Sequence, residues 1–178
     1  MNYFLAVSLV SADHHINLSK ITDICVKYGC NITQAKISLL GSVYAFHFLA
    51  QGLWHQISML EQKLQNLEKK LKFKSVHTRT FEIWNAPHAT SVLSYTIHVI
   101  SADRPGILDK FLNLIHAEGL RIEETQLSTH TNHLGTPVLN LLCKINVDNN
   151  YSISKLREIA AEFAEEQNLD LFIEPTRY

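Results

Sequence analysis

The sequence lacks the features that are typical of disulfide scaffolds and membrane proteins. Its three cysteines, Cys25, Cys30 and Cys143, are odd in number, lie in apolar surroundings and show no CxxC spacing. This pattern predicts free, buried thiols in a reducing compartment rather than a disulfide framework, a metal site or a redox motif. No positive charge precedes the apolar N-terminal run, and no apolar run is long enough to span a membrane. We therefore expect no signal peptide, no membrane insertion and a cytoplasmic location.

Neither sign of charge is in excess. The 178 residues include 16 Lys or Arg and 17 Asp or Glu, and the net charge of −1 argues against nucleic-acid binding through charge alone. One group of lysines is interleaved with Glu61 and Glu68, which favours a solvated face over a nucleic-acid patch. Its members are Lys63, Lys69, Lys70, Lys72 and Lys74.

Catalytic signatures are missing as well. The chain has no Gly-rich phosphate loop, no nucleophile elbow and no Ser/His/Asp arrangement, so we expect no enzyme activity. Ten histidines invite a metal hypothesis, but none of their spacings fits a recognised site. Should loops bring histidines together, the candidates are His14, His15, His130 and His133, the last two in an expected hairpin turn. The favoured expectation is that there is no metal site.

An internal repeat dominates what the sequence does contain. Residues 11–38 align without a gap to residues 101–128, at a constant offset of 90, with eight identities in 28 positions. In the first copy the identical residues are Ser11, Ala12, Asp13, Leu18, Lys20, Gly29, Ile32 and Ser38. A repeat of this length indicates two copies of one structural unit. We place the first at residues 1–84, a linker at 85–91 and the second at 92–178.

The hydrophobic periods predict the elements of each copy. Alternation over residues 95–99 predicts a strand, and apolar residues at helical spacing over 107–115 predict a helix that ends at Gly119, as Gly29 ends its counterpart. Each copy then continues with a hairpin, a second helix and a last strand, which we place at residues 73–81 in the first copy and 169–173 in the second. We assign the Leu60, Leu64, Leu67 and Leu71 stripe to core packing rather than a dimerising coiled coil. The order β-α-β-β-α-β is the ferredoxin-like motif, an α+β fold whose antiparallel sheet carries both helices on one face and leaves the other free for a partner.

The most informative short motif, Asp103–Leu108, lies between the first strand and first helix of the second copy. Asp103 is placed to cap the helix, Pro105 suits its first turn, and Gly106 leaves room for a ligand to approach the backbone. A helix N-terminus opened in this way presents free N–H groups and a partial positive charge, which suit a carboxylate. The alternative is that the motif is only a good helix start.

The whole chain resembles a tandem pair of ACT domains, which are modules that typically bind amino acids. The resemblance rests on Ala102–Ile107 (ADRPGI) with Gly119–Ile122 (GLRI), and on Gly29–Ile32 (GCNI) with Gly52–Ile57 (GLWHQI). With two such units and almost nothing else, the chain is similar to the family of glycine cleavage system transcriptional repressors. That resemblance implies a protein without catalytic activity that does not bind DNA directly. It implies action on a LysR-type transcriptional activator, with a small amino acid, glycine first, as effector and no other cofactor.

ACT ligands usually sit where two units meet, between a strand-to-helix loop and the start of the next strand in a neighbouring unit. Carried over by position, the site residues of the second copy are Asp103, Arg104, Pro105, Gly106, Ile107, Leu108, Arg121 and Ile122. Those of the first copy are Asp13, His14, Asn17, Asn31 and Ile32. The two units could complete each other within one chain, or edge strands could pair between chains to give a homodimer.

One departure and two alternatives stay open. The first copy has Ile16 where the second has Gly106, so its loop would crowd a ligand, and we expect any site to use the second loop. One alternative is a constitutive interaction module that has kept the fold but binds no small molecule. The other is the regulatory half of a formyltetrahydrofolate deformylase, which also begins with an ACT unit but needs a catalytic domain that this chain lacks.

Overall fold

The computed structural model describes residues 3–13, 16–80 and 93–176. Its contacts divide the chain into two compact units, Met1–Ala86 and Pro87–Tyr178. The linker predicted at residues 85–91 lies outside the described residues. Within the described part, no helix is long and apolar enough to cross a membrane.

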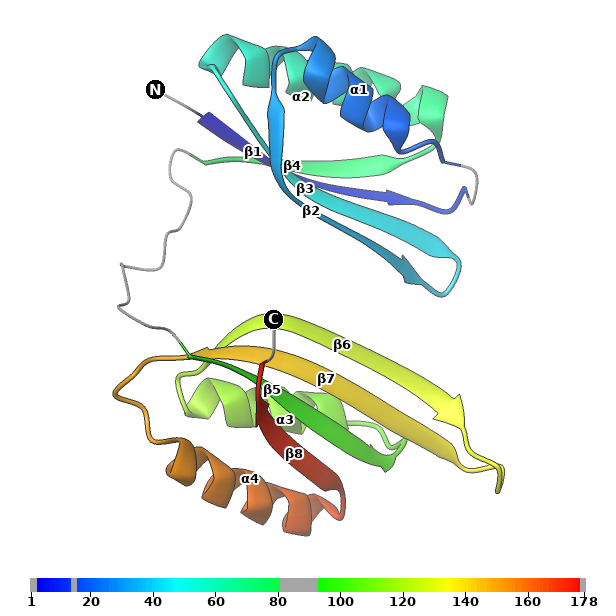
Figure 1. The fold of residues 1–178 in the computed structure, drawn as a ribbon. Coiled ribbons are helices and arrows are strands. Elements are labelled where there is room, and N and C mark those ends of the chain that lie inside the picture. The colour runs from blue at the N-terminus through cyan, green and yellow to red at the C-terminus, as the bar shows by residue number, and fades with distance from the viewer. Residues whose placement is uncertain (1–2, 14–15, 81–92, 177–178) are drawn as a thin grey trace. The chain divides into compact units, whose positions relative to one another are not determined.

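The first unit contains six elements in the predicted order. They are β1 (Tyr3–Ser11), α1 (Ser19–Lys27), β2 (Asn31–Leu40), β3 (Val43–Gly52), α2 (Trp54–Leu71) and β4 (Lys74–Thr80). The sheet is antiparallel in the order β2-β3-β1-β4. Both helices cover one face of it (Figure 1). The core between sheet and helices includes Leu5, Ile21, Phe48 and Leu64.

The second unit repeats this arrangement. Its elements are β5 (Leu93–Ala102), α3 (Ile107–Ala117), β6 (Arg121–Thr131), β7 (Pro137–Val147), α4 (Ile153–Gln167) and β8 (Asp170–Pro175), with the sheet order β6-β7-β5-β8. It has a core of its own, centred on Phe111, Leu141 and Leu156. The fold class predicted from the sequence, α+β with two ferredoxin-like units in tandem, is therefore confirmed.

The four helices within the described residues end in the same way. The residue after each last turn is left-handed, and the following amide bonds back across the turn in a Schellman motif. The left-handed residues are Gly29, Lys72, Gly119 and Asn168. In α2 the Phe73 amide bonds to the Glu68 carbonyl at 3.1 Å, so β4 begins one residue later than predicted. The last strand of the second unit, predicted at 169–173, likewise begins at Asp170, but it runs on to Pro175.

Two side-chain predictions are confirmed. All three cysteines are free and buried, and burial raises the pKa of the Cys25 thiol to about 12, which keeps it protonated and unreactive. The leucine stripe of α2 packs into the core: Leu60 and Leu64 are fully buried, and Leu67 and Leu71 pack against them.

Candidate functional site

The loop between β5 and α3 is shaped by a left-handed glycine. Gly106 has φ +90° and immediately precedes α3, and no side chain caps that helix. The predictions that Asp103 caps α3 and that Pro105 lies in its first turn are therefore wrong. The reason is that the chain still has to turn at Gly106 before it can become helical, so both residues lie outside the helix. Asp103 is exposed.

The same glycine leaves the start of α3 open. Apart from Gly106 and its two neighbours in the chain, no described residue has a heavy atom within 4 Å of the place where a Cβ would stand at Gly106. The first N–H groups of a helix have no partner within it, so those from Ile107 to Asp109 face outward at the positive end of the helix dipole. Ile107 is buried in the core and fixes this turn, while Leu108 is 37% exposed beside it. This geometry can receive a carboxylate.

Two contacts hold the loop in place. The Asp103 amide donates to the Pro137 carbonyl at 2.9 Å, and the Arg104 guanidinium donates to the Gln167 carbonyl at the end of α4. A cation suits that position because a helix C-terminus carries partial negative charge. Arg104 thus anchors the loop to α4 and is already occupied, so it is poorly placed to meet a ligand.

The first unit closes the equivalent loop differently. Ile16 stands at the position of Gly106 in the repeat alignment. In that alignment α1, which begins at Ser19, starts two residues later than α3 does. The Asn17 side chain accepts the Ser19 amide at 3.0 Å and so takes the place of the glycine turn. The Asp13 carbonyl accepts the Ile16 amide at 3.1 Å. His14 lies outside the described residues.

The predicted contacts at the strand starts lie far from these loops within each unit. Arg121 on β6 and Ser94 on β5 both pair with Asn146, so Arg121 is level with the beginning of β5. The loop follows the other end of β5 at Ala102, eight residues on, which is about 25 Å at the rise of a strand. Arg121–Ile122 therefore cannot complete a site with the loop of their own unit.

The first unit has the same separation. Asn31 on β2 and Phe4 on β1 both pair with Gln51, whereas the loop follows Ser11 at the far end of β1. A ligand that touches both a loop and a strand start therefore cannot bind within a single unit. Each strand start also carries a bulge, between Ile32 and Gln34 and at the corresponding place in β6, and bulges commonly redirect side chains near binding sites.

Two of the four histidines predicted as metal candidates, His130 and His133, lie within the described residues. His130 lies in β6 rather than in the hairpin turn, because that strand continues to Thr131, and His133 lies in the turn itself. His14 and His15 lie outside the described residues. Among the residues that the structure places, no group of three or more His, Cys, Asp or Glu side chains could hold a metal ion.

A partly buried polar cluster between α2 and β4 was not predicted from the sequence. Ser75 donates its amide (2.9 Å) and its hydroxyl (2.8 Å) to Glu68, and these bonds hold the pKa of that carboxyl below its usual value. His77 Nε2 lies 2.8 Å from the Ser75 hydroxyl oxygen and donates to it, because the hydroxyl proton is already used. The His77 side chain is 4% exposed, and Nδ1 faces Glu61 at 3.9 Å with no hydrogen-bond partner among the described residues.

This cluster makes the first unit sensitive to acid. Burial lowers the pKa of His77 from 6.5, and this effect outweighs the negative charges of Glu61 and Glu68, which raise it. At a pH just below 6.5 the unfolded chain therefore binds a proton at His77 more readily than the folded protein does. The His77 contribution to stability is therefore complete well above pH 6.5 and falls as the pH drops through that value. We expect the urea midpoint of the first unit to fall between pH 7.5 and 5.5, and to fall less in His77→Gln. The exposed His55→Gln is the control, and an equal pH slope in wild type and His77→Gln would contradict the assignment.

Comparison with known proteins supplies the remaining observation. No family model matches the chain. It is 28% identical over 122 residues to the glycine cleavage system transcriptional repressor of Escherichia coli K12, and equally to that of Shigella flexneri. The match covers 68% of this chain and 63% of the relative, so it spans less than two thirds of the relative's length.

The chain resembles glycine cleavage system transcriptional repressors. The resemblance predicted from the sequence is thus confirmed. Two solved structures support the fold: a protein assigned as a glycine cleavage system transcriptional repressor (TM-score 0.75, 18% identity, covering 100% of this chain and 99% of that one) and an unknown protein from Galdieria sulphuraria (TM-score 0.79, 16% identity, covering 99% and 100%). Both matches extend over the two units, and at this identity the likeness shows the fold alone.

Proposed function

We propose that this protein is a cytoplasmic regulator, not an enzyme, that senses a small amino acid and controls the transcription of glycine cleavage genes through a protein partner. The observation that carries the proposal is the open turn at Gly106. Its backbone is left-handed, nothing crowds it, and the helix behind it presents free N–H groups. The similarity to a relative named as a glycine cleavage system transcriptional repressor supplies the pathway, with glycine as first candidate for the effector.

The proposed ligand lies with its carboxylate on the N–H groups that follow Gly106. Asp103, exposed at the end of β5, is placed to meet the ammonium group. The opposing contacts come from the start of a strand, Asn31–Ile32 or Arg121–Ile122, of a second chain. The separation of loop and strand start within each unit supports a site shared between two chains, which makes the protein a homodimer.

The partner that we propose is a LysR-type transcriptional activator rather than DNA. A chain with a net charge of −1 has little of the positive potential that non-specific DNA binding requires. For the amino acid to act as a signal, it must bind the free protein and the partner-bound protein with different affinities, because equal affinities shift no equilibrium.

Isothermal titration with glycine and a panel of other amino acids tests the site, and we expect saturable binding. Gly106→Asn should weaken it by about tenfold or more, a loss of roughly 1.4 kcal/mol, because the new side chain enters the space that the ligand needs. Asn tolerates the left-handed backbone, so the loop should stay folded. Gly41→Asn is the matched control, since Gly41 has φ +59° and an equally open surrounding but lies in the β2–β3 turn.

The competing function is an interaction module that binds no small molecule, and the occupied Asn17 side chain in the first loop favours it. Folded protein that gives no heat with any amino acid at two temperatures would establish that competitor. Equal binding by wild type and Gly106→Asn would move the site away from the second loop.

A further inference from the structure

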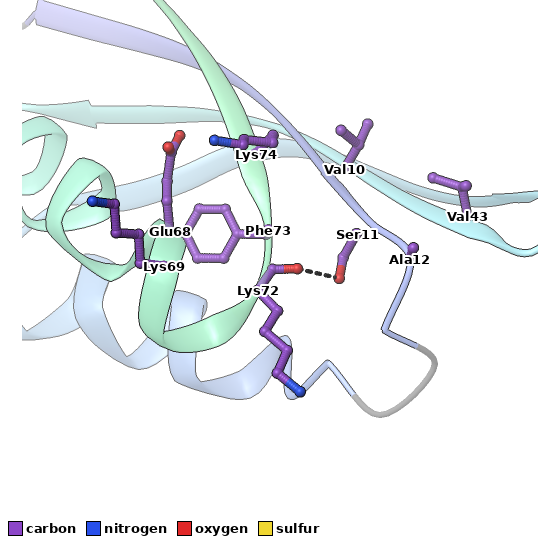
Figure 2. A pocket seen from close by; sticks show the side chains of 9 residues that line it. All are labelled: Val10, Ser11, Ala12, Val43, Glu68, Lys69, Lys72, Phe73 and Lys74. Carbon is purple, nitrogen blue, oxygen red and sulfur yellow. Dashed lines mark hydrogen bonds between the residues drawn. The ribbon is translucent and has the colours of Figure 1, made fainter.

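The first unit contains a pocket that the proposed function does not use. It is an open depression of about 500 Å³ where the end of β1 meets the start of β3, the last turn of α2 and the start of β4 (Figure 2). Small-molecule sites commonly enclose about 300–1,000 Å³. Four of its lining residues are apolar: Val10, Ala12, Val43 and Phe73.

The second unit has a corresponding pocket, which serves as an internal comparison. It encloses about 310 Å³ at the end of β5, beside the end of α4 and the start of β8. Ser101 takes the place of Ser11, and Asn168 takes the place of Lys72 as the left-handed residue after the helix. The pocket is therefore a feature of the repeated unit, and its chemistry can be compared between the copies.

The two pockets differ in charge. Lys69, Lys72 and Lys74 line the first, whereas the second has no lysine and carries Asp170 at the position of Lys74. Glu68 also lines the first pocket, but its carboxylate is committed to the Ser75 amide and hydroxyl. The first pocket thus has three cations against one anion, and the second has a single anion.

Stabilisation of the helix end does not account for all three lysines. A helix C-terminus carries about half a negative charge, which Lys69 and Lys72 suit. Lys74 lies beyond the helix in β4, and it is partly balanced by Glu68, whose pKa it helps to lower. Among the described residues, none of the three has an ion-pair partner within 4.0 Å. The pocket therefore keeps a net positive charge.

Lys72 adds a conformational argument. Its φ of +54° is unfavourable for a lysine, and the equivalent Asn168 is the residue type that tolerates this backbone better. Figure 2 shows the Lys72 carbonyl turned to the Ser11 hydroxyl, which donates to it at 2.9 Å, while the side chain extends away from Val10 and Val43. The backbone is fixed and the ammonium group is free to turn toward a ligand.

We propose that this pocket of the first unit binds a small organic anion, with its charged group on the lysines and an apolar part against Val10, Val43 and Phe73. The site is independent of the amino-acid site at Gly106. The loop after β1, which has Ile16 in place of Gly106, and this pocket together give the first unit a ligand preference different from that of the second.

Amide chemical shifts of the full chain, titrated with phenyl phosphate and with benzoate, test the proposal. We expect saturable shifts at residues 10–12 and 72–74. The double variant Lys72→Asn/Lys74→Asp gives the first pocket the residues of the second at these two positions, and should weaken binding by about tenfold or more because charge-assisted contacts are lost. The control, Lys20→Asn/Lys27→Asp on α1, makes the same change in net charge outside the pocket.

Four outcomes would overturn the proposal: no shifts at these amides, equal shifts with the cation benzylamine, equal binding by inorganic phosphate alone, or equal affinity in wild type and the double variant. A loss of affinity in the control that matches the loss in the double variant would also overturn it, since it would reflect net charge alone. The single variants Lys72→Asn and Lys74→Asp replace the double variant should that one fail to fold. Glycine binding is expected to be the same in all these variants.

Discussion

Phe111→Ala is expected to lower the free energy of unfolding of the second unit by about 3–5 kcal/mol and to leave the first unit unchanged. The Phe111 ring is fully buried at the centre of a core that contains residues of the second unit alone. Stabilities of roughly 0.05–0.15 kcal/mol per residue give a unit of about 90 residues some 5–14 kcal/mol, so the loss is a large share of the total.

The repeat supplies the reciprocal variant. Ile21 occupies the position of Phe111 in the first unit, is equally buried, and should cost that unit about 2–5 kcal/mol when replaced by alanine. Hydrogen exchange followed by mass spectrometry on peptides from each unit separates the two effects. If either variant lowered protection in both units alike, the two cores would form one cooperative structure and the proposed domain boundaries would have no energetic meaning.

The fold was predictable because its signals are local and occur twice. A strand period that changes to a helix period after Ser101 returns at the same offset after Ser11, and Gly29 and Gly119 end both helices in the left-handed conformation that was expected of them. Each copy thus supported the assignment of the other. The details of the second loop were less predictable, because Asp-x-Pro-Gly fits both a capped helix and a glycine turn, and only the backbone at Gly106 distinguishes them.

Two features could not be predicted because they depend on contacts between distant parts of the chain. Polar residues alternate along β4 in a pattern that is typical of a solvent-exposed strand face: Ser75, His77 and Arg79. Their side chains instead contact α2, where Glu68 accepts from Ser75 and Glu61 lies beside His77 and Arg79. The lysines near the end of α2 were expected to form a solvated face. Lys69, Lys72 and Lys74 are exposed as expected. They also line a pocket, because the end of β1 is held beside them by a hydrogen bond between residues 61 positions apart.

Gly29→Ala is expected to destabilise the first unit by about 2–3 kcal/mol. The backbone at Gly29 has φ +70°, where a side chain costs roughly 1–2 kcal/mol. A Cβ there would also stand 2.5 Å from the Gln56 amide nitrogen. The Gln56 side chain cannot move freely, because its Oε1 accepts a hydrogen bond from the Leu53 backbone amide at 2.7 Å and so caps the start of α2. Loss of such a cap costs about 1 kcal/mol.

Gly119→Ala isolates the backbone share of this effect. Gly119 is the repeat equivalent of Gly29, with φ +64°. Beyond its chain neighbours, no described residue lies within 4 Å of the place where its Cβ would stand, so only the strain of roughly 1–2 kcal/mol should remain. Gln56→Ala removes the side chain that a Cβ at Gly29 would meet. Adding Gly29→Ala to that variant should therefore lower the free energy of unfolding by no more than Gly119→Ala does. Urea unfolding of wild type, Gly29→Ala, Gln56→Ala and the double variant, resolved by unit, closes the cycle, and Gly119→Ala is measured beside them. If Gly29→Ala cost the same with and without Gln56, the close approach of helix end and cap would contribute nothing, and left-handed strain alone would account for the glycine in both copies.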